Sequence, residues 1–154
     1  MFVRAMSAER RKSPPPTIKL KSEFRRVFRT GRRVRDDFLQ IISALSDRKT
    51  TGGEHDRGRV GYVIPEKAVK GAVRRNRIRR LLREALRKWW GHVLSGWDIV
   101  LQVGRFPNHD HAEYVEMVLL GLFMKADLLD DDGVELAKER IESLSKRFHR
   151  AERH

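Results

Sequence analysis

The sequence predicts an α+β domain in which helices pack on a small β-sheet. Segments with helical spacing and segments with strand character follow one another in the order helix, strand, strand, helix, strand, helix, and one more helical segment ends the chain. The 154 residues are enough to build a single hydrophobic core. The chain contains no cysteine, so a disulfide scaffold, a zinc ribbon and thiol catalysis are excluded.

The chain begins with a stretch that has little to bury. Residues 1–17 combine basic side chains with three consecutive prolines, and we expect a flexible basic arm there. A short amphipathic helix follows, with Ser22 as its expected N-cap and Gly31 as its end. Its apolar face is formed by Phe24, Val27 and Phe28.

Three strands are expected from their content of apolar and β-branched residues. The first spans residues 34–45 and the second residues 59–64, and a glycine-containing loop over residues 46–57 separates them. The third strand spans residues 98–103 and is bounded by glycines.

The segment between the second and third strands predicts a helix with one apolar and one basic face. The apolar residues recur at helical spacing and form a single stripe: Ile78, Leu81, Leu82, Ala85, Leu86 and Trp89. The opposite side carries a basic ridge, which consists of Asn76, Arg80, Arg83 and Arg87 with Arg77 and Arg79 on its flanks. Glu84 alone interrupts this ridge, and its helical spacing from Arg80, Arg87 and Lys88 predicts a local ion pair.

Two more helices are expected after the third strand. The first spans residues 112–129 and has a second apolar edge, formed by Met117, Leu120, Met124 and Leu128. The second spans residues 134–148 and follows three aspartates, which suit a helix N-terminus. We expect residues 130–154 to form a helical extension that folds back on the preceding helix. The alternative is a detached helix that binds another molecule or a second copy of the chain.

Basic charge is concentrated in two segments. The 34 Lys and Arg residues exceed the 21 Asp and Glu residues by 13. Residues 1–35 carry a net charge of +10 (12 basic, 2 acidic) and residues 70–88 carry +8 (9 basic, 1 acidic), whereas the rest of the chain is net acidic. Such concentrated patches are typical of proteins that bind a polyanion such as a nucleic acid.

Residues 67–87 resemble the signature of the bacterial ribonuclease P protein subunit. The core of that signature is the triplet Arg75, Asn76 and Arg77, followed by an apolar residue, two basic residues and an amphipathic helix. Three further segments are similar to the family: the helix with Phe24, Val27, Phe28 and Gly31, the strand at residues 59–61 and the strand at residues 98–101.

The resemblance implies a fold, an activity and partners. The implied fold is a small α–β sandwich of the bacterial ribonuclease P protein type over residues 18–129, with a left-handed βαβ crossover in its sheet. The implied activity is endonucleolytic removal of the 5′ leader of precursor tRNA by a ribonucleoprotein enzyme, whose RNA subunit carries the chemistry and binds Mg²⁺. The protein is expected to bind the catalytic RNA one to one, and precursor tRNA, without a metal, cofactor or catalytic residue of its own.

The resemblance also implies two RNA-binding surfaces. The catalytic RNA is expected at Arg74, Arg75, Asn76, Arg77, Arg79, Arg80, Arg83 and Arg87. The 5′ leader is expected in a cleft between the first helix and the sheet, bordered by Phe24, Phe28 and Lys67, because aromatic rings stack on the bases of a single strand. Plain core packing explains both phenylalanines equally well. The alternative function is an RNA- or DNA-binding module with no connection to catalysis.

Other kinds of site have little support in the sequence. His109, Asp110 and His111 are adjacent and do not converge as ligands of a closed metal site do, and Asp110 is expected to cap the helix that follows. Asp36 and Asp37 are interpreted as turn residues. No apolar run approaches the ~20 residues that cross a bilayer, so we expect no transmembrane helix, no membrane partner and a cytoplasmic location.

Overall fold

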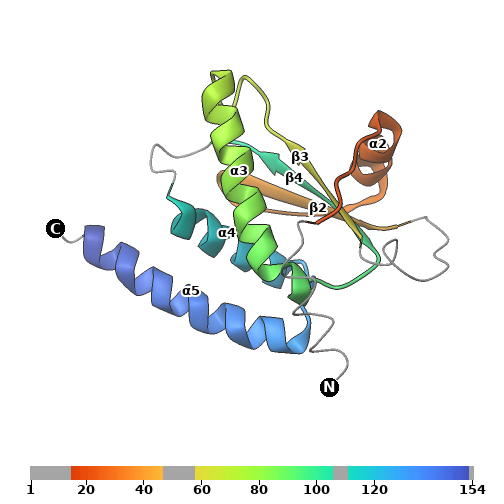
Figure 1. The fold of residues 1–154 in the computed structure, drawn as a ribbon. Helices are drawn as coiled ribbons and strands as arrows, with labels where there is room; N and C mark the ends of the chain where they lie inside the picture. Colours follow the sequence, from red (N-terminus) through yellow and green to blue (C-terminus); the bar gives the residue numbers. More distant parts are fainter. Residues whose placement is uncertain (1–14, 47–57, 106–110, 153–154) are drawn as a thin grey trace.

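The computed structural model describes residues 15–46, 58–105 and 111–152. They form a four-stranded sheet with helices on both faces (Figure 1), which confirms the expected α+β class. In chain order the elements are α2 (Lys21–Thr30), β1 (Arg32–Arg35), β2 (Leu39–Leu45), β3 (Arg59–Val63), α3 (Ala72–Trp89), the short 3₁₀ turn η2 (Trp90–His92), β4 (Trp97–Val103), α4 (Ala112–Lys125) and α5 (Asp131–Glu152).

The sheet has the strand order β1–β2–β4–β3. The pairs β1–β2 and β2–β4 are antiparallel, whereas β3 and β4 are parallel. A parallel pair needs a crossover connection, and α3 supplies it. This is the βαβ unit that the family resemblance implied.

The helices cover the two faces of the sheet unequally. Of the described helices, only α2 packs on one face, against β2 and β4, while α3 and α4 cover the other face and α5 runs along the outside of α4 (Figure 1). The larger apolar core lies between the sheet and α3 and α4, and a smaller one lies under α2. The basic helix α3 and the lone helix α2 are thus held by opposite faces of one sheet.

The single strand predicted over residues 34–45 is two antiparallel strands. The Asp36 side chain makes the turn between them, because its Oδ1 accepts hydrogen bonds from the backbone N–H groups of Phe38 at 3.0 Å and Leu39 at 2.9 Å. Such an Asx turn competes with a continuous strand. The prediction of one strand was therefore wrong, while the prediction of turn residues at this point was right.

Helix boundaries differ from the predicted ones where local hydrogen bonds intervene. Helix α2 begins at Lys21 with Leu20 in the N-cap position, so Ser22 is not the cap. Helix α4 ends at Lys125 instead of residue 129, because Asp127 adopts a left-handed backbone with φ of 56° and the Leu128 N–H bonds to the Phe123 carbonyl at 3.0 Å.

Helix α5 is longer than predicted at both ends. It begins at Asp131, and the Asp130 side chain caps it by accepting a hydrogen bond from the Gly133 N–H at 2.6 Å. It packs back on α4, as the sequence predicted, with Ala137 and Leu144 fully buried. In the second apolar edge predicted for α4, Leu120 and Leu128 are buried, whereas Met117 and Met124 stay partly exposed.

Described residues just before α2 also contact the sheet. Thr17 pairs with Val60 of β3, and the Ile18 N–H bonds to the Val60 carbonyl at 2.9 Å, so contact with the sheet begins before residue 18. The rest of the predicted arm, residues 1–14, most of the predicted loop over residues 46–57, and Asp110 lie outside the described residues. No helix among those described is long and apolar enough to cross a membrane.

Candidate nucleic-acid interface

The apolar stripe of α3 anchors the helix and leaves the basic ridge facing outward. Ile78, Leu82 and Leu86 have no exposed surface, as their spacing predicted. The outward residues are exposed: Asn76, Arg77, Arg80, Arg83 and Arg87. Guanidinium groups on such a rigid face can bind phosphates with paired hydrogen bonds.

The single acidic residue of α3 neutralises little of the basic ridge. Glu84, the one acidic residue of α3, lies 3.9 Å from the Arg87 guanidinium, and both side chains are more than half exposed. An exposed pair of this kind contributes at most about 1 kcal/mol and leaves both groups hydrated. Lys88 pairs instead with Glu116 of α4, at 3.7 Å. The local ion pair predicted for Glu84 is present, with Arg87 as its partner.

Several of the predicted RNA-binding arginines, besides Arg87, also have partners within the protein. The Arg75 guanidinium donates to the Val69 carbonyl at 3.1 Å, so it fastens the loop before α3 to the helix. Arg79 donates to the side-chain oxygen of Asn76 at 3.4 Å, and Arg83 lies 5.7 Å from the centre of the Tyr62 ring. These contacts orient the ridge, a role that spacing alone does not reveal.

Tyr62 supports Arg83 from the end of β3. Burial raises the pKa of its hydroxyl to about 12, and the nearby charges of Arg83 and Arg79 only partly oppose this. The phenol therefore stays protonated at neutral pH, and the Arg83 guanidinium rests on a neutral aromatic ring.

Helix α2 comes very close to the sheet. A Cβ atom on Gly61 of β3 would overlap the Phe24 ring, with its Cζ atom at 2.7 Å, so only glycine fits there. The Phe28 ring lies 5.6 Å under the Arg33 guanidinium of β1. Phe24 and Phe28 are both half-buried and pack on the smaller core. They pack in the core and also keep part of their surface exposed at its border.

A buried ion cluster fixes the N-terminal half of α2 on the sheet. Asp98 of β4 is fully buried and bonds to Arg59 of β3 at 3.1 and 2.9 Å, and also to Arg26 of α2. Arg59 in turn pairs with Glu23 of α2. Burial lowers the pKa of Arg59, but the hydrogen bonds and charges of Asp98 and Glu23 outweigh it and raise that pKa above its usual value. The cluster sets the position of α2 through directional bonds.

Mostly polar residues lie across the sheet near the C-terminal ends of β3 and β4. One row of paired residues crosses all four strands there: Arg35, Gln40, Gln102 and Val63. The first three of these residues and Lys67 line a hollow of about 280 Å³. The structure thus places the predicted leader-binding residue Lys67 at the edge of a real concavity.

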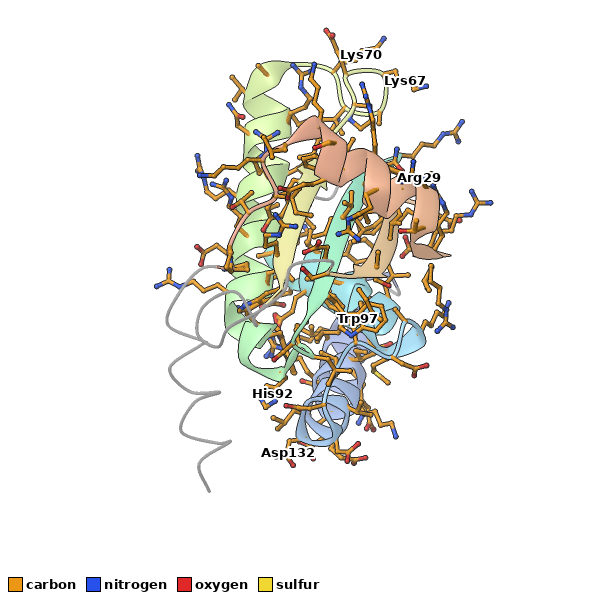
Figure 2. The ribbon with its side chains drawn as sticks, turned by 90° about the vertical axis from the view of Figure 1, so that its right-hand side faces the viewer. Arg29, Lys67, Lys70, His92, Trp97 and Asp132 are labelled. Atoms are coloured by element: carbon orange, nitrogen blue, oxygen red, sulfur yellow. The ribbon has the colours of Figure 1, made fainter. Side chains whose placement is uncertain are left out.

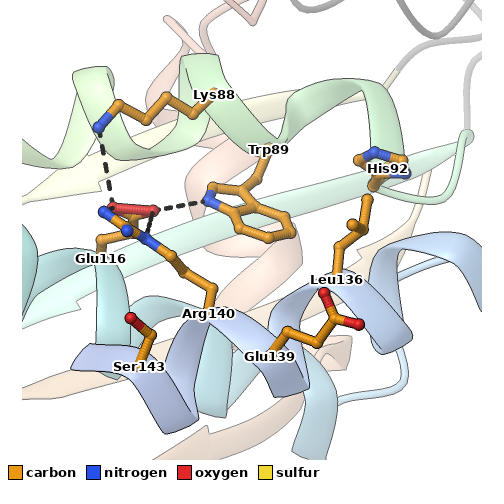
Figure 3. Close-up of a pocket in the computed structure, with 8 residues that line it drawn as sticks. All are labelled: Lys88, Trp89, His92, Glu116, Leu136, Glu139, Arg140 and Ser143. Atoms are coloured by element: carbon orange, nitrogen blue, oxygen red, sulfur yellow. Dashed lines mark hydrogen bonds and ion pairs between the residues drawn. The ribbon is translucent and has the colours of Figure 1, made fainter. Parts of the chain in front are cut away.

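A second hollow, of about 530 Å³, lies where α3, α4 and α5 meet (Figure 3). Its centre is Glu116, which is only 3% exposed. It accepts hydrogen bonds from Trp89 and Arg140, each at 3.1 Å, and pairs with Lys88. Burial raises the pKa of Glu116, but the bonds from Arg140 and Trp89 and the charge of Lys88 outweigh it and hold that pKa below its usual range. Glu116 joins α5 to the end of the basic helix.

Charge differs between the two ends of the molecule. Figure 2 shows Arg29, Lys67 and Lys70 near one end, while His92 and Asp132 lie at the other, where α5 begins. Asp130, Asp131 and Asp132 gather at that second end. The labelled basic residues and this acidic cluster therefore lie at opposite ends of the molecule.

Comparisons with known proteins agree with this geometry. A family model described as Ribonuclease P matches residues 15–126. Ribonuclease P protein components are similar to the chain at 37% identity in a Roseiflexus species (58% of this chain, 66% of the relative), 44% in Nitrosomonas eutropha (40% and 52%) and 29% in a Synechocystis species (75% and 90%). The matches to the first two relatives therefore span about two thirds and half of their lengths.

Solved structures share the fold. The RNase P protein of Staphylococcus aureus superposes with a TM-score of 0.64 at 22% identity, over 74% of this chain and 97% of that one. The Thermotoga maritima protein superposes with a TM-score of 0.58 at 22% identity, over 71% and 96%. The family match ends at residue 126, so α5 lies beyond it. Since that match covers α2, all four strands, α3 and α4, the chain belongs to the ribonuclease P protein family.

Proposed function

We propose that this chain is the protein subunit of a ribonuclease P ribonucleoprotein, in which it binds the catalytic RNA and the 5′ leader of precursor tRNA and promotes removal of the leader. The observation that carries the proposal is the basic ridge of α3. It is exposed, and a largely buried apolar stripe holds it in place. Family membership supplies the identity of the polyanion.

The catalytic RNA binds the basic ridge in this proposal. Arg77, Arg80, Arg83 and Arg87 offer charge and paired donors to phosphates. Arg74, Arg75 and Arg79 are half-buried and support the same surface, and Asn76 adds an amide that donates and accepts.

The leader lies on the other face of the sheet, beside α2. Phe24 and Phe28 border that region with partly exposed rings, and Lys67 lies at its open end. A single strand can stack its bases on such rings whatever their sequence. Because α2 and α3 occupy opposite faces of the sheet, one protein can hold both RNAs at once. The proposed complex contains one protein per catalytic RNA.

The RNA subunit carries the chemistry and holds the Mg²⁺ in this proposal. The protein adds fixed cations where phosphates of two RNA molecules come together, so it reduces the requirement for screening cations in solution. Its contribution is therefore largest at low Mg²⁺ concentration.

The test is reconstitution with a bacterial ribonuclease P RNA, with mature tRNA 5′ ends as the measurement. We expect cleavage at Mg²⁺ concentrations at which the RNA alone is nearly inactive, and no cleavage by RNA-free protein. The double variant Arg77→Ala/Arg80→Ala should lose this stimulation, whereas Lys138→Ala/Lys146→Ala, which removes two exposed cations from α5, should keep it. Wild-type protein that leaves the Mg²⁺ requirement unchanged would refute the proposal.

A further inference from the structure

Helix α5 supplies a second cation to a carboxylate that already has one nearby. Glu116 of α4 is buried, and its Oε1 accepts hydrogen bonds from Arg140 Nε and Trp89 Nε1, each at 3.1 Å. Its Oε2 accepts a bond from Arg140 Nη2 at 3.3 Å. Lys88 Nζ lies 3.7 Å from the same Oε2, beyond hydrogen-bond distance (Figure 3). Two cations from different helices therefore meet one anion.

Arg140 is the stronger of these two partners. Its guanidinium bonds to both oxygens of the carboxylate, which is the geometry in which arginine binds an acid most firmly. Burial raises the pKa of Glu116, and the hydrogen bond from Arg140 opposes this more strongly than the charge of Lys88 does. The Lys88 side chain also stays 61% exposed, against 33% for Arg140. Lys88 thus keeps most of its surface for another anion.

Without Arg140, the same carboxylate would depend on Lys88. A buried carboxylate that has lost its main cation is strongly unfavourable, and the lysine side chain is flexible enough to move from 3.7 Å to hydrogen-bond distance. The ammonium would then be held against α4, with less attraction for an anion outside the protein. Arg140 therefore decides whether Lys88 faces inward or outward.

Lys88 continues the basic surface of α3. It follows Arg77 by eleven residues, about three helical turns, so both lie on the same flank of the basic ridge. Arg87, the last residue of the ridge, precedes it directly and is also more than half exposed. An RNA backbone that follows the ridge to its C-terminal end reaches Lys88.

We propose that α5 adds Lys88 to the surface that binds the catalytic RNA: Arg140 neutralises Glu116, and the Lys88 ammonium binds an RNA phosphate next to Arg87. Arg140 is a positioning residue in this inference and does not itself touch the RNA. It lies beyond residue 126, where the family match ends. The inference rests on the proposed function, because the catalytic RNA is the polyanion that the basic ridge binds there.

Chemical labelling of the free protein tests the first step. Acetic anhydride acetylates exposed amines, and mass spectrometry of the resulting peptides gives the rate at each lysine. Arg140→Met keeps an unbranched side chain and removes the guanidinium, and it should slow acetylation of Lys88 by roughly 3-fold, as one partly exposed ion pair would. Glu116→Gln/Arg140→Met should return the rate at least to that of the wild type. Lys138 of α5, which is also exposed, is the internal reference and should react at the same rate in every variant.

Binding of the catalytic RNA over a series of salt concentrations tests the second step. Lys88→Ala should flatten the slope of log affinity against log salt by about 0.7–0.9, the value for one phosphate contact. Arg140→Met should flatten the slope by a similar amount, and the two losses should not add in Lys88→Ala/Arg140→Met. Glu116→Gln/Arg140→Met should restore the wild-type slope. Lys138→Ala, which removes another exposed cation of α5, is the matched control and should leave the slope unchanged.

Three results would overturn the inference. A slope that stays flat in Glu116→Gln/Arg140→Met would show that Arg140 itself contacts the RNA. Acetylation of Lys88 that does not change in Arg140→Met would show that Arg140 does not control the ammonium. An unchanged slope in Lys88→Ala would show that Lys88 binds no phosphate, and this surface substitution is decisive even if melting temperatures reveal that another variant misfolds.

These results are distinguishable from a failure of the proposed function. In all three cases the wild-type protein still binds the catalytic RNA and stimulates cleavage, so the proposed function stands. A wild-type protein that neither binds nor stimulates the catalytic RNA refutes the proposed function, and the inference falls with it.

Discussion

Replacing Gly61 by alanine should push helix α2 away from the sheet. The new methyl group would lie 2.7 Å from Cζ of Phe24 and 3.4 Å from Cβ of Ile18. The first distance is shorter than real carbon atoms allow, and a ring in a packed core has few other places to go. Overpacking of this kind costs about 1–3 kcal/mol. For a chain of this size, a loss of about 2 kcal/mol lowers the melting temperature by roughly 4–8 °C.

A double-mutant cycle in urea unfolding tests the reason for the destabilisation. Phe24→Leu shortens the ring that the new methyl group meets, so Gly61→Ala should be less harmful in the Phe24→Leu background, with a coupling of about 1 kcal/mol or more. Gly121→Ala is the matched control. Its Cβ would meet no atom within 4 Å in the interior of α4, so it should leave stability unchanged or raise it by up to ~1 kcal/mol.

Additive effects would refute this reasoning. If Gly61→Ala costs the same with Phe24 and with leucine at that position, the ring does not cover Gly61 in solution and α2 is less closely held than the structure shows. A Gly61→Ala variant as stable as wild type would have the same meaning.

Three other outcomes follow from the packing and the charges. Leu144→Ala truncates a side chain with 0% exposure and should cost roughly 2–5 kcal/mol of unfolding free energy. Leu136→Ala on the same helix, at a residue that is 44% exposed, should cost under about 0.5 kcal/mol. Equal melting temperatures of these two variants would mean that α5 is not docked on α4. Arg77→Ala/Arg80→Ala should flatten the slope of log affinity for the catalytic RNA against log salt by about 0.7–0.9 for each phosphate that the variant no longer neutralises, and an unchanged slope would place the ridge in solvent. The pKa of Glu116 is lowered in the folded state, so its contribution to stability is present above its unfolded pKa near 4.3 and is lost as pH falls through the lower folded pKa. Glu116→Gln should therefore be less stable than wild type at pH 7. The difference in unfolding free energy between the two proteins, measured by urea unfolding, should narrow below about pH 4.

Elements in which apolar residues recur at a regular spacing over many positions were predictable from the sequence. The stripe of α3 is an example, since Ile78, Leu82 and Leu86 are all fully buried. The two strands at residues 32–45 were not separable in this way. The turn at Asp36 depends on one side chain bonding to the local backbone, and the buried Phe38 right after it continues the apolar pattern.

The sequence pattern could not predict contacts between distant parts of the chain. Arg59 and Asp98 are 39 positions apart and form a buried pair, and nothing around either residue points to the other. Gln40 and Gln102 meet only because of the register of β2 and β4, which tertiary packing determines. Glu116 looked like an ordinary polar residue in an apolar helix, because its partners come from two other helices.

The strand order also decides when the protein becomes able to bind RNA during its synthesis. β4 lies between β2 and β3 in the sheet, yet it is the last strand to be made. At bacterial-type elongation rates of about 5–20 residues per second, the ribosome needs roughly 2–8 seconds to proceed from the end of β3 to the end of β4. Within that interval the arginines of α3 are added to those of α2, but until β4 is made β2 and β3 have no common neighbour in the sheet, and the row of Arg35, Gln40, Gln102 and Val63 does not exist. Arrival of β4 joins the two halves, so a polyanion meets both finished surfaces only in a chain whose translation has passed residue 103.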